Sequence, residues 1–210
     1  PAPMTSISFP STSTPAIRRA TPLDAPALID VLGRAFLDDP VFEWVIPDRE
    51  HRRQSINAFF ALFAEAVQPH DEIYVADRGL GAALWVPPGQ PPVADEFAEE
   101  FEERAVALAG DNAAQLGELM AAMEAHHPSE PHQYLWFLAV DPECQGRGIG
   151  SALLTHVLAR CDRTSTPAYL EATSPQNARL YERHGFDVVA TINEHGGAPL
   201  WAMWRDPVDS

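Results

Sequence analysis

Apolar residues recur at helical spacing in two stretches of the N-terminal half. A Thr-Pro pair at 21–22 offers an N-cap followed by proline, and apolar positions then continue at intervals of three or four to Phe36. Asp48 is placed to cap a second helix, whose apolar positions recur as far as Val67. The short run 16–20 before them predicts an edge strand. The start of the chain therefore predicts a strand followed by two amphipathic helices.

Two β-rich runs follow these helices. Residues 73–76 and 82–86 are separated by Asp-Arg-Gly at 77–79, which predicts a hairpin, and the proline-rich run 87–92 ends it. Residues 93–126 predict one or two amphipathic helices with a heavily acidic face. The middle of the chain is therefore expected to combine a hairpin with acidic helical segments.

Strands and helices alternate in the C-terminal half. The run QYLWFLAV at 133–140 is rich in aromatic and other β-favouring residues and predicts a central strand. The elements predicted after it are a helix over 149–160, a strand over 167–172, a helix from Ser174-Pro175 to Gly185, and strands over 186–191 and 199–204. This order predicts an α/β sheet with a final antiparallel pair, in a single domain over 17–210.

The first residues have a different composition. Residues 1–16 are rich in Pro, Ser and Thr, and they lack the basic region and the apolar region of a secretory signal. We therefore expect a flexible lead-in, with the folded domain starting near Ile17.

Composition and charge narrow the function classes. The 210 residues include 30 acidic and 14 basic residues, all of them Arg, for a formal net charge of −16. That charge argues against nucleic acid as a partner, and no apolar run reaches the ~20 residues of a membrane span. Without Lys, Schiff-base and P-loop lysine chemistry are excluded. Cys144 and Cys161 form neither a disulfide framework nor metal-ligand spacing, which favours a reducing, cytoplasmic setting.

The strongest motif is the glycine-rich turn QGRGIG at 145–150, between a predicted strand and a predicted helix. Alternating glycines let the backbone turn tightly and approach a ligand closely, and free N–H groups at the following helix start favour an anion. Arg147 adds a positive charge. The spacing differs from the dinucleotide pattern G-x-G-x-x-G and from a Walker loop, so we predict a pyrophosphate site of another kind. The alternative is a glycine-rich turn without a ligand.

Two segments make the sequence similar to a known family. The run LAVDP at 138–142, followed by QGRGIG, resembles the acetyl-CoA-binding motif of the GNAT N-acetyltransferases, and NARLYERHGF at 177–186 resembles the second half of that signature. The resemblance covers roughly 17–205. It implies a mixed, mostly antiparallel sheet with a splayed central parallel strand pair, flanked by helices on both faces.

Shorter matches point to one branch of that family. They are Ala35-Phe36, Asp39-Pro40, His127-Pro128, Glu130-Pro131 and Leu170-Glu171-Ala172-Thr173-Ser174, which look like the puromycin N-acetyltransferase branch.

The resemblance also implies which residues hold acetyl-CoA as a co-substrate. The expected binding residues are Leu138, Ala139, Val140, Gln145, Gly146, Arg147, Gly148, Ile149, Gly150, Ser151, Asn177 and Tyr181. Amides of residues 146–151 would hold the pyrophosphate, and Asn177 would contact the pantetheine arm. The N–H of Val140 would polarise the thioester carbonyl, as an oxyanion-type donor.

Proton transfer is assigned to two further side chains. By the same resemblance Tyr181 is the general acid for the departing thiolate; the alternative is a tyrosine that only packs in the core. We expect Glu171 to be the general base, directly or through water; the alternative is a carboxylate paired with an arginine. The histidines at 126, 127 and 132 are alternative bases near neutral pH. No metal is expected.

These assignments predict an acetyl-CoA-dependent N-acetyltransferase that transfers the acetyl group by direct attack of a primary amine, without a covalent enzyme intermediate. The acceptor is predicted to be a cationic small molecule, such as an aminoacyl-type antibiotic or metabolite. Alternatives are a protein N-terminal or lysine acetyltransferase and a non-catalytic acyl-CoA-binding module. A monomer and a homodimer both fit the sequence.

The acidic segment 91–130 bears on that acceptor. It contains ten acidic residues and one arginine, and it is either a solvated helix face or the rim of an acceptor cleft that attracts a cation. Four aromatic residues are candidates to line such a cleft: Trp44, Tyr74, Trp85 and Trp136.

Overall fold

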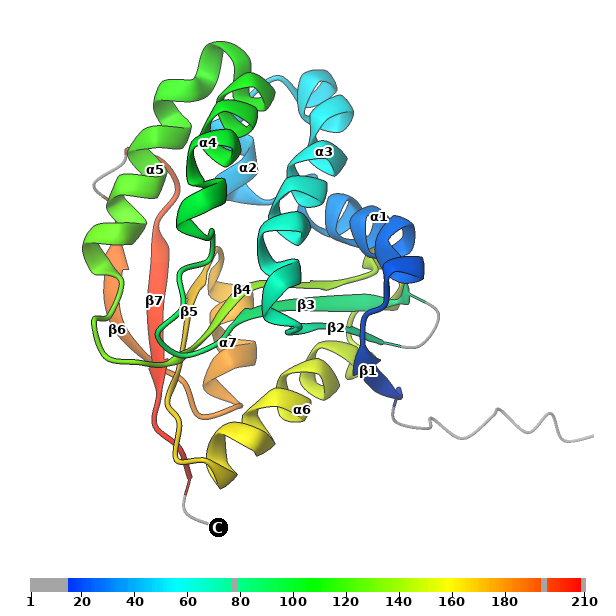
Figure 1. The fold of residues 1–210 in the computed structure, drawn as a ribbon, viewed down its shortest axis with the longest axis vertical. Helices are drawn as coiled ribbons and strands as arrows, with labels where there is room; N and C mark the ends of the chain where they lie inside the picture. The colour runs from blue at the N-terminus through cyan, green and yellow to red at the C-terminus, as the bar shows by residue number, and fades with distance from the viewer. Residues whose placement is uncertain (1–14, 77–78, 194–195, 209–210) are drawn as a thin grey trace, which may run out of the picture.

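A single seven-stranded sheet organises the chain, with helices on both of its faces (Figure 1). The computed structural model describes residues 15–76, 79–193 and 196–208, so most of the predicted lead-in and part of the predicted hairpin turn lie outside the described residues. The strand order is β1-β2-β3-β4-β5-β7-β6. The strands are β1 (Ile17–Arg19), β2 (Ile73–Ala76), β3 (Gly81–Val86), β4 (Gln133–Val140), β5 (Ala168–Ala172), β6 (Asp187–Ile192) and β7 (Leu200–Arg205).

The central strands β4 and β5 form the only parallel pair among the described strands. They pair over a short stretch, from Gln133 opposite Ala168 to Leu135 opposite Leu170. β4 nevertheless stays paired with β3 as far as Val140. The two halves of the sheet therefore diverge beyond Leu135, as Figure 1 shows by the different directions of β2–β4 and β5–β7. The prediction of a mixed sheet with a splayed parallel pair is confirmed.

A bulge in β4 accompanies this divergence. On β3, Leu84 lies opposite Phe137 and the next residue, Trp85, lies opposite Leu135, so Trp136 is an extra residue in β4. A bulge bends its strand and increases the local twist. The bulge thus lies directly after the last paired position of β4 and β5.

The helices form two layers. One face of the sheet carries α1 (Ala25–Phe36), α2 (Pro40–Val45), α3 (Arg49–Val67), α4 (Asp95–Ala109) and α5 (Ala113–His126), and the other carries α6 (Ile149–Arg163) and α7 (Pro175–Glu182). Each layer has its own apolar core, so side chains that alternate along a strand belong to different cores. Tyr169 and Leu170 of β5, for example, lie in opposite cores.

Most predicted elements are present, and α2 is the one that the hydrophobic pattern does not predict. Six residues are too few for helical periodicity to show. The local chemistry does mark its start: the Asp39 carboxylate accepts the Val41 N–H at 2.9 Å, and Pro40 occupies the first helical position. The predicted first helix begins as a short 3-10 turn over Pro22–Asp24, and the acidic segment forms two helices.

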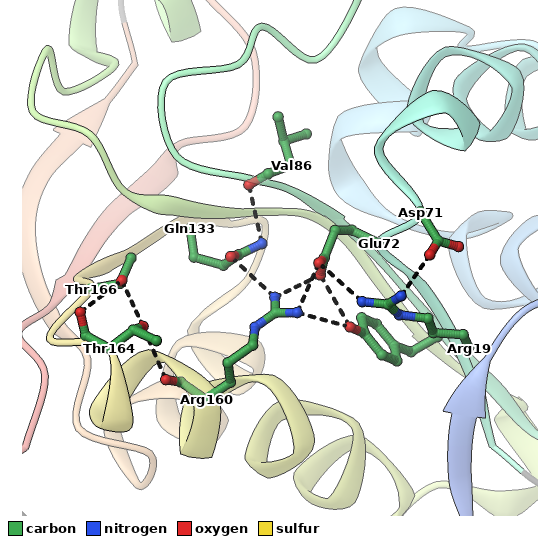
Figure 2. Close-up of polar contacts among 9 residues, drawn as sticks. Arg19, Asp71, Glu72, Val86, Gln133, Arg160, Thr164 and Thr166 are labelled. Atoms are coloured by element: carbon green, nitrogen blue, oxygen red, sulfur yellow. Dashed lines mark hydrogen bonds and ion pairs between the residues drawn. The ribbon is translucent and has the colours of Figure 1, made fainter.

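A buried polar network joins α6 to the sheet (Figure 2). Arg160 donates two hydrogen bonds to the Glu72 carboxylate, at 2.8 and 2.7 Å, and a third to Gln133 at 3.3 Å. Tyr74 donates to the same carboxylate at 3.1 Å. This network fixes the C-terminal half of α6 against β2 and β4, while its N-terminus remains free for other contacts. None of the described helices is long and apolar enough to cross a membrane.

Candidate active site

The glycine-rich turn leads directly into α6. Gly146 and Gly148 have φ values of 75° and 81°, in the left-handed region, and Gly148 is the N-cap residue of α6. A Cβ built on either glycine meets nothing within 4 Å, so the space above the turn is open. The first N–H groups of α6 have no partner within the helix and face an anion favourably. An open backbone cradle at a helix start fits a pyrophosphate group.

A groove of about 670 Å³ extends from this turn to α7. Of the twelve predicted binding residues it is lined by Leu138, Val140, Gln145, Gly146, Gly148, Ile149, Gly150, Ser151, Asn177 and Tyr181. Ala139 is buried, with its backbone facing β3, and Arg147 lies exposed beside the groove. The structure thus brings ten of the predicted binding residues to one groove.

The charge of this groove differs from that of the chain as a whole. Arg179 and Arg183 line it, and Arg147 lies beside it. Most described arginines form ion pairs with a carboxylate, but these three form none with any described residue. Uncompensated guanidinium groups in an acidic protein favour an anionic ligand such as a phosphate.

The backbone of β4 presents N–H groups to this groove. Asp141 donates its N–H to the Leu80 carbonyl oxygen at 2.9 Å, so that N–H faces β3. Because N–H groups alternate in direction along an antiparallel strand, those of Val140 and Leu138 face away from β3, into the gap left by the splay. This is the orientation that the predicted role of Val140 requires.

Tyr181 lies where the groove meets a second, smaller cavity. This inner cavity has a volume of about 100 Å³ and shares Phe36, Asp39, Leu138, Asn177 and Tyr181 with the groove. The Tyr181 hydroxyl makes no hydrogen bond within the described part of the chain, and its ring packs on Phe186 at 6.1 Å. Burial, and then the nearby charge of Asp39, raise the pKa of Tyr181 above its ordinary value, so the hydroxyl keeps its proton.

Asp39 and Thr173 hold the residues at this junction in place. Thr173 donates its hydroxyl to the Asp39 carboxylate at 2.6 Å and accepts a hydrogen bond from the Asn177 amide at 3.3 Å. Burial raises the pKa of Asp39, opposed by hydrogen bonds from Thr173 and Val41. This chain of contacts links the start of α2 to the start of α7 across the groove.

The inner cavity is mainly apolar and aromatic, with Phe36, Phe42, Phe63, Trp136, Phe137 and Met123 among its lining residues. On its far side it shares Met120, Met123, Trp136 and Glu171 with a third cavity of about 530 Å³. This outer cavity lies between the proline-rich loop 87–93, the end of α5 and the loop 127–132. The three cavities therefore follow one another, with Tyr181 at the first junction and Glu171 at the second.

Glu171 is a buried carboxylate with unused bonding capacity. Its side chain is 4% exposed, and none of the described arginines pairs with it. Oε2 accepts the Tyr134 hydroxyl at 2.8 Å, whereas Oε1 has no hydrogen-bond partner among the residues that the structure describes. Nδ1 of His127 lies 4.0 Å from Oε1. Within the described residues, Glu171 is therefore not paired with an arginine, the alternative that the sequence left open.

Aromatic rings enclose this carboxylate. The Tyr134 and Tyr169 rings pack against each other with their centroids 5.8 Å apart, and His127 packs edge-on against both rings, at 4.9 and 5.2 Å. Burial and then the charge of Glu171 raise the pKa of both tyrosines, so both keep their protons. Tyr134 donates to Glu171, whereas the Tyr169 hydroxyl makes no hydrogen bond with any described residue. His132 donates from Nδ1 to the Glu130 carbonyl oxygen, and burial lowers its pKa, so it is neutral near pH 7.

Comparison with known proteins identifies the family. Residues 39–186 match the acetyltransferase (GNAT) family. A solved structure from Corynebacterium glutamicum, described as a histone acetyltransferase and related acetyltransferase, is 34% identical, has a TM-score of 0.71, and is aligned over 94% of this chain and 99% of that one. The chain belongs to the GNAT acetyltransferase family.

Curated relatives match this chain over smaller stretches. A mycothiol acetyltransferase of Mycobacteroides abscessus is 34% identical over 62% of this chain and 47% of its own length. An S-alkylcysteine N-acetyltransferase of Bacillus subtilis is 35% identical over 31% of this chain and 40% of its own. The chain spans less than half the length of these relatives. The predicted membership of an acetyltransferase family is confirmed, at the level of the family.

The aromatic and acidic residues proposed for an acceptor cleft of this GNAT protein divide into two groups. Trp136 lines both the inner and the outer cavity, but Tyr74 and Trp85 are buried in the opposite core with α6, and Trp44 lines none of the three cavities. Of the ten carboxylates in 91–130, Glu124 and Glu130 line the outer cavity. The six on α4 are exposed to solvent, so the solvated-face alternative describes that helix.

Several residues of the site carried no assigned role in the sequence. Asp39, Thr173, Tyr134 and Tyr169 belong to short matches or to a strand, and their contacts depend on elements far apart in the chain. Asp39-Pro40 was a usable signal, because it marks a helix start at the edge of the groove. Among the described residues, no group of three or more His, Cys, Asp or Glu side chains is arranged to hold a metal ion.

Proposed function

We propose that this protein is an acetyl-CoA-dependent N-acetyltransferase whose acceptor is the primary amine of a small molecule. One observation carries the proposal: a basic groove, a small apolar cavity and an acidic outer cavity follow one another, with Tyr181 and Glu171 at the two junctions. An anionic thioester and a cationic amine would enter from opposite ends and meet between these two side chains.

The groove residues would hold acetyl-CoA. Amides of residues 146–151 and the guanidinium groups of Arg179 and Arg183 would bind its phosphates, and Asn177 the pantetheine arm. The Val140 N–H, facing the gap between β4 and β5, would donate to the thioester carbonyl oxygen and to the negative charge that develops on it.

Glu171 would prepare the acceptor for attack. An amine is protonated near neutral pH, so its ammonium must give up a proton before the nitrogen lone pair can attack the carbonyl carbon. Oε1 of Glu171, which has no partner among the described residues, would take that proton, directly or through water. His127, half-buried beside it at the outer cavity, would return the proton to solvent.

Tyr181 would act at the last step. As the C–S bond breaks, its hydroxyl would donate to the sulfur of the departing thiolate. A thiol has a pKa of ~8.5, by analogy with cysteine, so the more weakly acidic tyrosine would act chiefly by hydrogen bonding. The acetyl group then remains on the acceptor nitrogen, and coenzyme A leaves through the groove.

The short matches to the puromycin N-acetyltransferase branch support an aminoacyl-type acceptor, and the inner cavity, which contains several aromatic rings, supports one with an apolar side chain. Protein N-termini and lysines are the rival acceptors. The confined inner cavity favours a small molecule over a folded protein.

A transfer assay tests the proposal. The protein is mixed with acetyl-CoA and each member of a panel of small amines, short peptides and a lysine-containing protein, while release of the CoA thiol and mass of the product are measured. We expect acetylated small amines. Faster acetylation of peptides or proteins would favour the rival, and acetyl-CoA binding without transfer to any acceptor would support a non-catalytic module.

A further inference from the structure

The path assigned to the acceptor has one sign of charge. The carboxylates of Asp39 and Glu171 line the inner cavity, and those of Glu171, Glu124 and Glu130 line the outer one. Along the described lining of both cavities there is no arginine, and the chain contains no lysine. The groove on the other side of Tyr181, by contrast, is lined by two arginines.

Nearby cationic groups do not alter this. Arg52, the most buried arginine of α3, donates to the carbonyl oxygens of Leu37 and Ile46, at 2.6 and 2.5 Å. His132 is buried and bonded to a backbone carbonyl. His127 faces Glu171, so a proton on its ring would be balanced by that carboxylate. No described group is therefore available to neutralise an anion on the acceptor.

A free α-amino acid would bring such an anion with it. Its carboxylate is two bonds from the amine, so an amine placed at Glu171 would put the carboxylate inside the same cavity. A buried charge without a partner is strongly unfavourable, and a neighbouring charge of the same sign adds to the penalty. An amide, an ester or a simple amine carries no such charge.

We propose that the acceptor is an amine with no carboxylate on its α-carbon: an aminoacyl amide or ester, or a simple primary amine, carrying an apolar group. This inference rests on the proposed function and narrows its substrate class. It also separates this chain from the S-alkylcysteine N-acetyltransferase it resembles, because S-alkylcysteine is an amino acid. Glu171, buried between the two cavities with one oxygen that no described residue pairs with, is the group that would bind the amine.

Three matched acceptors test this inference. They are phenylalanine, phenylalaninamide and phenethylamine, which share a benzyl group and differ at the α-carbon. The amide has a less basic amine than the amino acid, whereas phenethylamine has one at least as basic, so the pair separates the effect of the carboxylate from that of amine basicity. We expect kcat/KM for both carboxylate-free amines to exceed that for phenylalanine by about 10²-fold or more.

A pair of charge-reversal variants tests whether the outer cavity causes the preference against a carboxylate. Glu124→Arg introduces a guanidinium at the outer cavity, and Glu118→Arg makes the same change at an exposed site of α5 that lines none of the three cavities. Glu124→Arg should narrow the preference for phenethylamine over phenylalanine by about tenfold, and Glu118→Arg should not.

The outcomes are distinguishable. Phenylalanine acetylated as efficiently as both carboxylate-free amines would overturn the inference and leave the proposed function intact. An equal preference for phenethylamine over phenylalanine in Glu124→Arg and Glu118→Arg would overturn the assignment of the outer cavity to the acceptor. Acetyl-CoA binding with no turnover of any of the three amines, or of the wider panel, would overturn the proposed function itself.

Discussion

Two buried glutamates, one in each layer of the molecule, have opposite surroundings. Glu72 lies on the α6 side of the sheet, where Arg160 and Tyr74 occupy both of its oxygens (Figure 2). Glu171 lies among the cavities, with one bond from Tyr134 and one oxygen that no described residue fills. Both carboxylates are about equally hidden, with side chains 10% and 4% exposed.

The difference separates a structural carboxylate from a functional one. A buried charge whose bonds are complete holds elements together, and the Glu72–Arg160 pair ties α6 to β2. A buried charge with bonds left unmade is unfavourable for folding, and such groups concentrate at sites that bind or react. The same side chain thus serves stability on one face of the sheet and, we infer, chemistry on the other.

The largest effect is expected from neutralising the functional carboxylate. Glu171→Gln keeps the shape and the bond from Tyr134 but cannot take a proton, so kcat/KM for the amine should fall by about 10²–10⁴-fold. Steady-state kinetics of Glu72→Gln provide the control, since that change should leave the rate of the folded enzyme nearly unaltered. Similar activities for the two variants would contradict the distinction between a functional Glu171 and a structural Glu72.

The second effect concerns two tyrosines: Tyr181 at the junction of the groove and the inner cavity, and Tyr74 beside Glu72. Tyr181→Phe should lower kcat by about 10²-fold with little change in acetyl-CoA affinity, because only the hydrogen bond to the leaving sulfur is lost. Tyr74→Phe, which removes a bond to Glu72, is the matched control and should leave kcat unchanged.

The pH profile sharpens that result. Burial and Asp39 raise the pKa of Tyr181, so its proton is retained as the pH rises through the ordinary tyrosine value of ~10. Wild-type kcat should therefore show no Tyr181-dependent fall below that pH. A basic limb below it that Tyr181→Phe abolishes would contradict the assigned environment of this side chain.

The third effect tests the two ends of α6, of which one is anchored by Arg160 and the other faces the groove. Gly148→Val introduces side-chain atoms into the open cradle and should raise the KM for acetyl-CoA about tenfold or more, through lost contacts to a charged group. Gly196→Val is the control for backbone strain, since Gly196 has a similar φ of 76° and a Cβ there also meets nothing within 4 Å. An equal KM for acetyl-CoA in both variants would contradict the assignment of the pyrophosphate site to this turn.

The smallest effect concerns long-range charge. Glu124→Gln at the outer cavity should lower kcat/KM for a cationic acceptor about two- to threefold, and added salt should reduce this difference by screening. Glu99→Gln on the solvated face of α4 should have no effect. An equally large fall in kcat/KM for Glu99→Gln would instead indicate that the whole acidic segment attracts the cationic acceptor.

Local signals predicted much of this fold and one side of the site. The helix caps at Asp48 and Ser174, the glycine turn before α6 and the β-rich run of β4 act over a few residues, so the sequence displays them directly. The groove residues followed, because the motifs that carry them lie on β4, α6 and α7.

The other side of the site depends on long-range packing. Tyr134 and Glu171 meet because β4 and β5 pair in parallel, 37 residues apart in the chain. Tyr74 and Trp85 were assigned to the wrong face for a related reason: a strand buried on both faces has no alternation that shows which side chains face which core. Contacts between residues far apart in the chain are not visible in the sequence, so the sequence left open whether Glu171 had an arginine partner.

The most direct test of the account is the free energy of unfolding of Glu72→Gln and Glu171→Gln, measured by urea denaturation at neutral pH. Glu72→Gln should lower it by about 2 kcal/mol, a value reduced for the partial exposure of Arg160, because a compensated pair is broken. Glu171→Gln should change it by less than about 1 kcal/mol, or raise it, because an uncompensated charge is removed. A loss of stability in Glu171→Gln as large as that in Glu72→Gln would contradict the claim that Glu171 is held for chemistry.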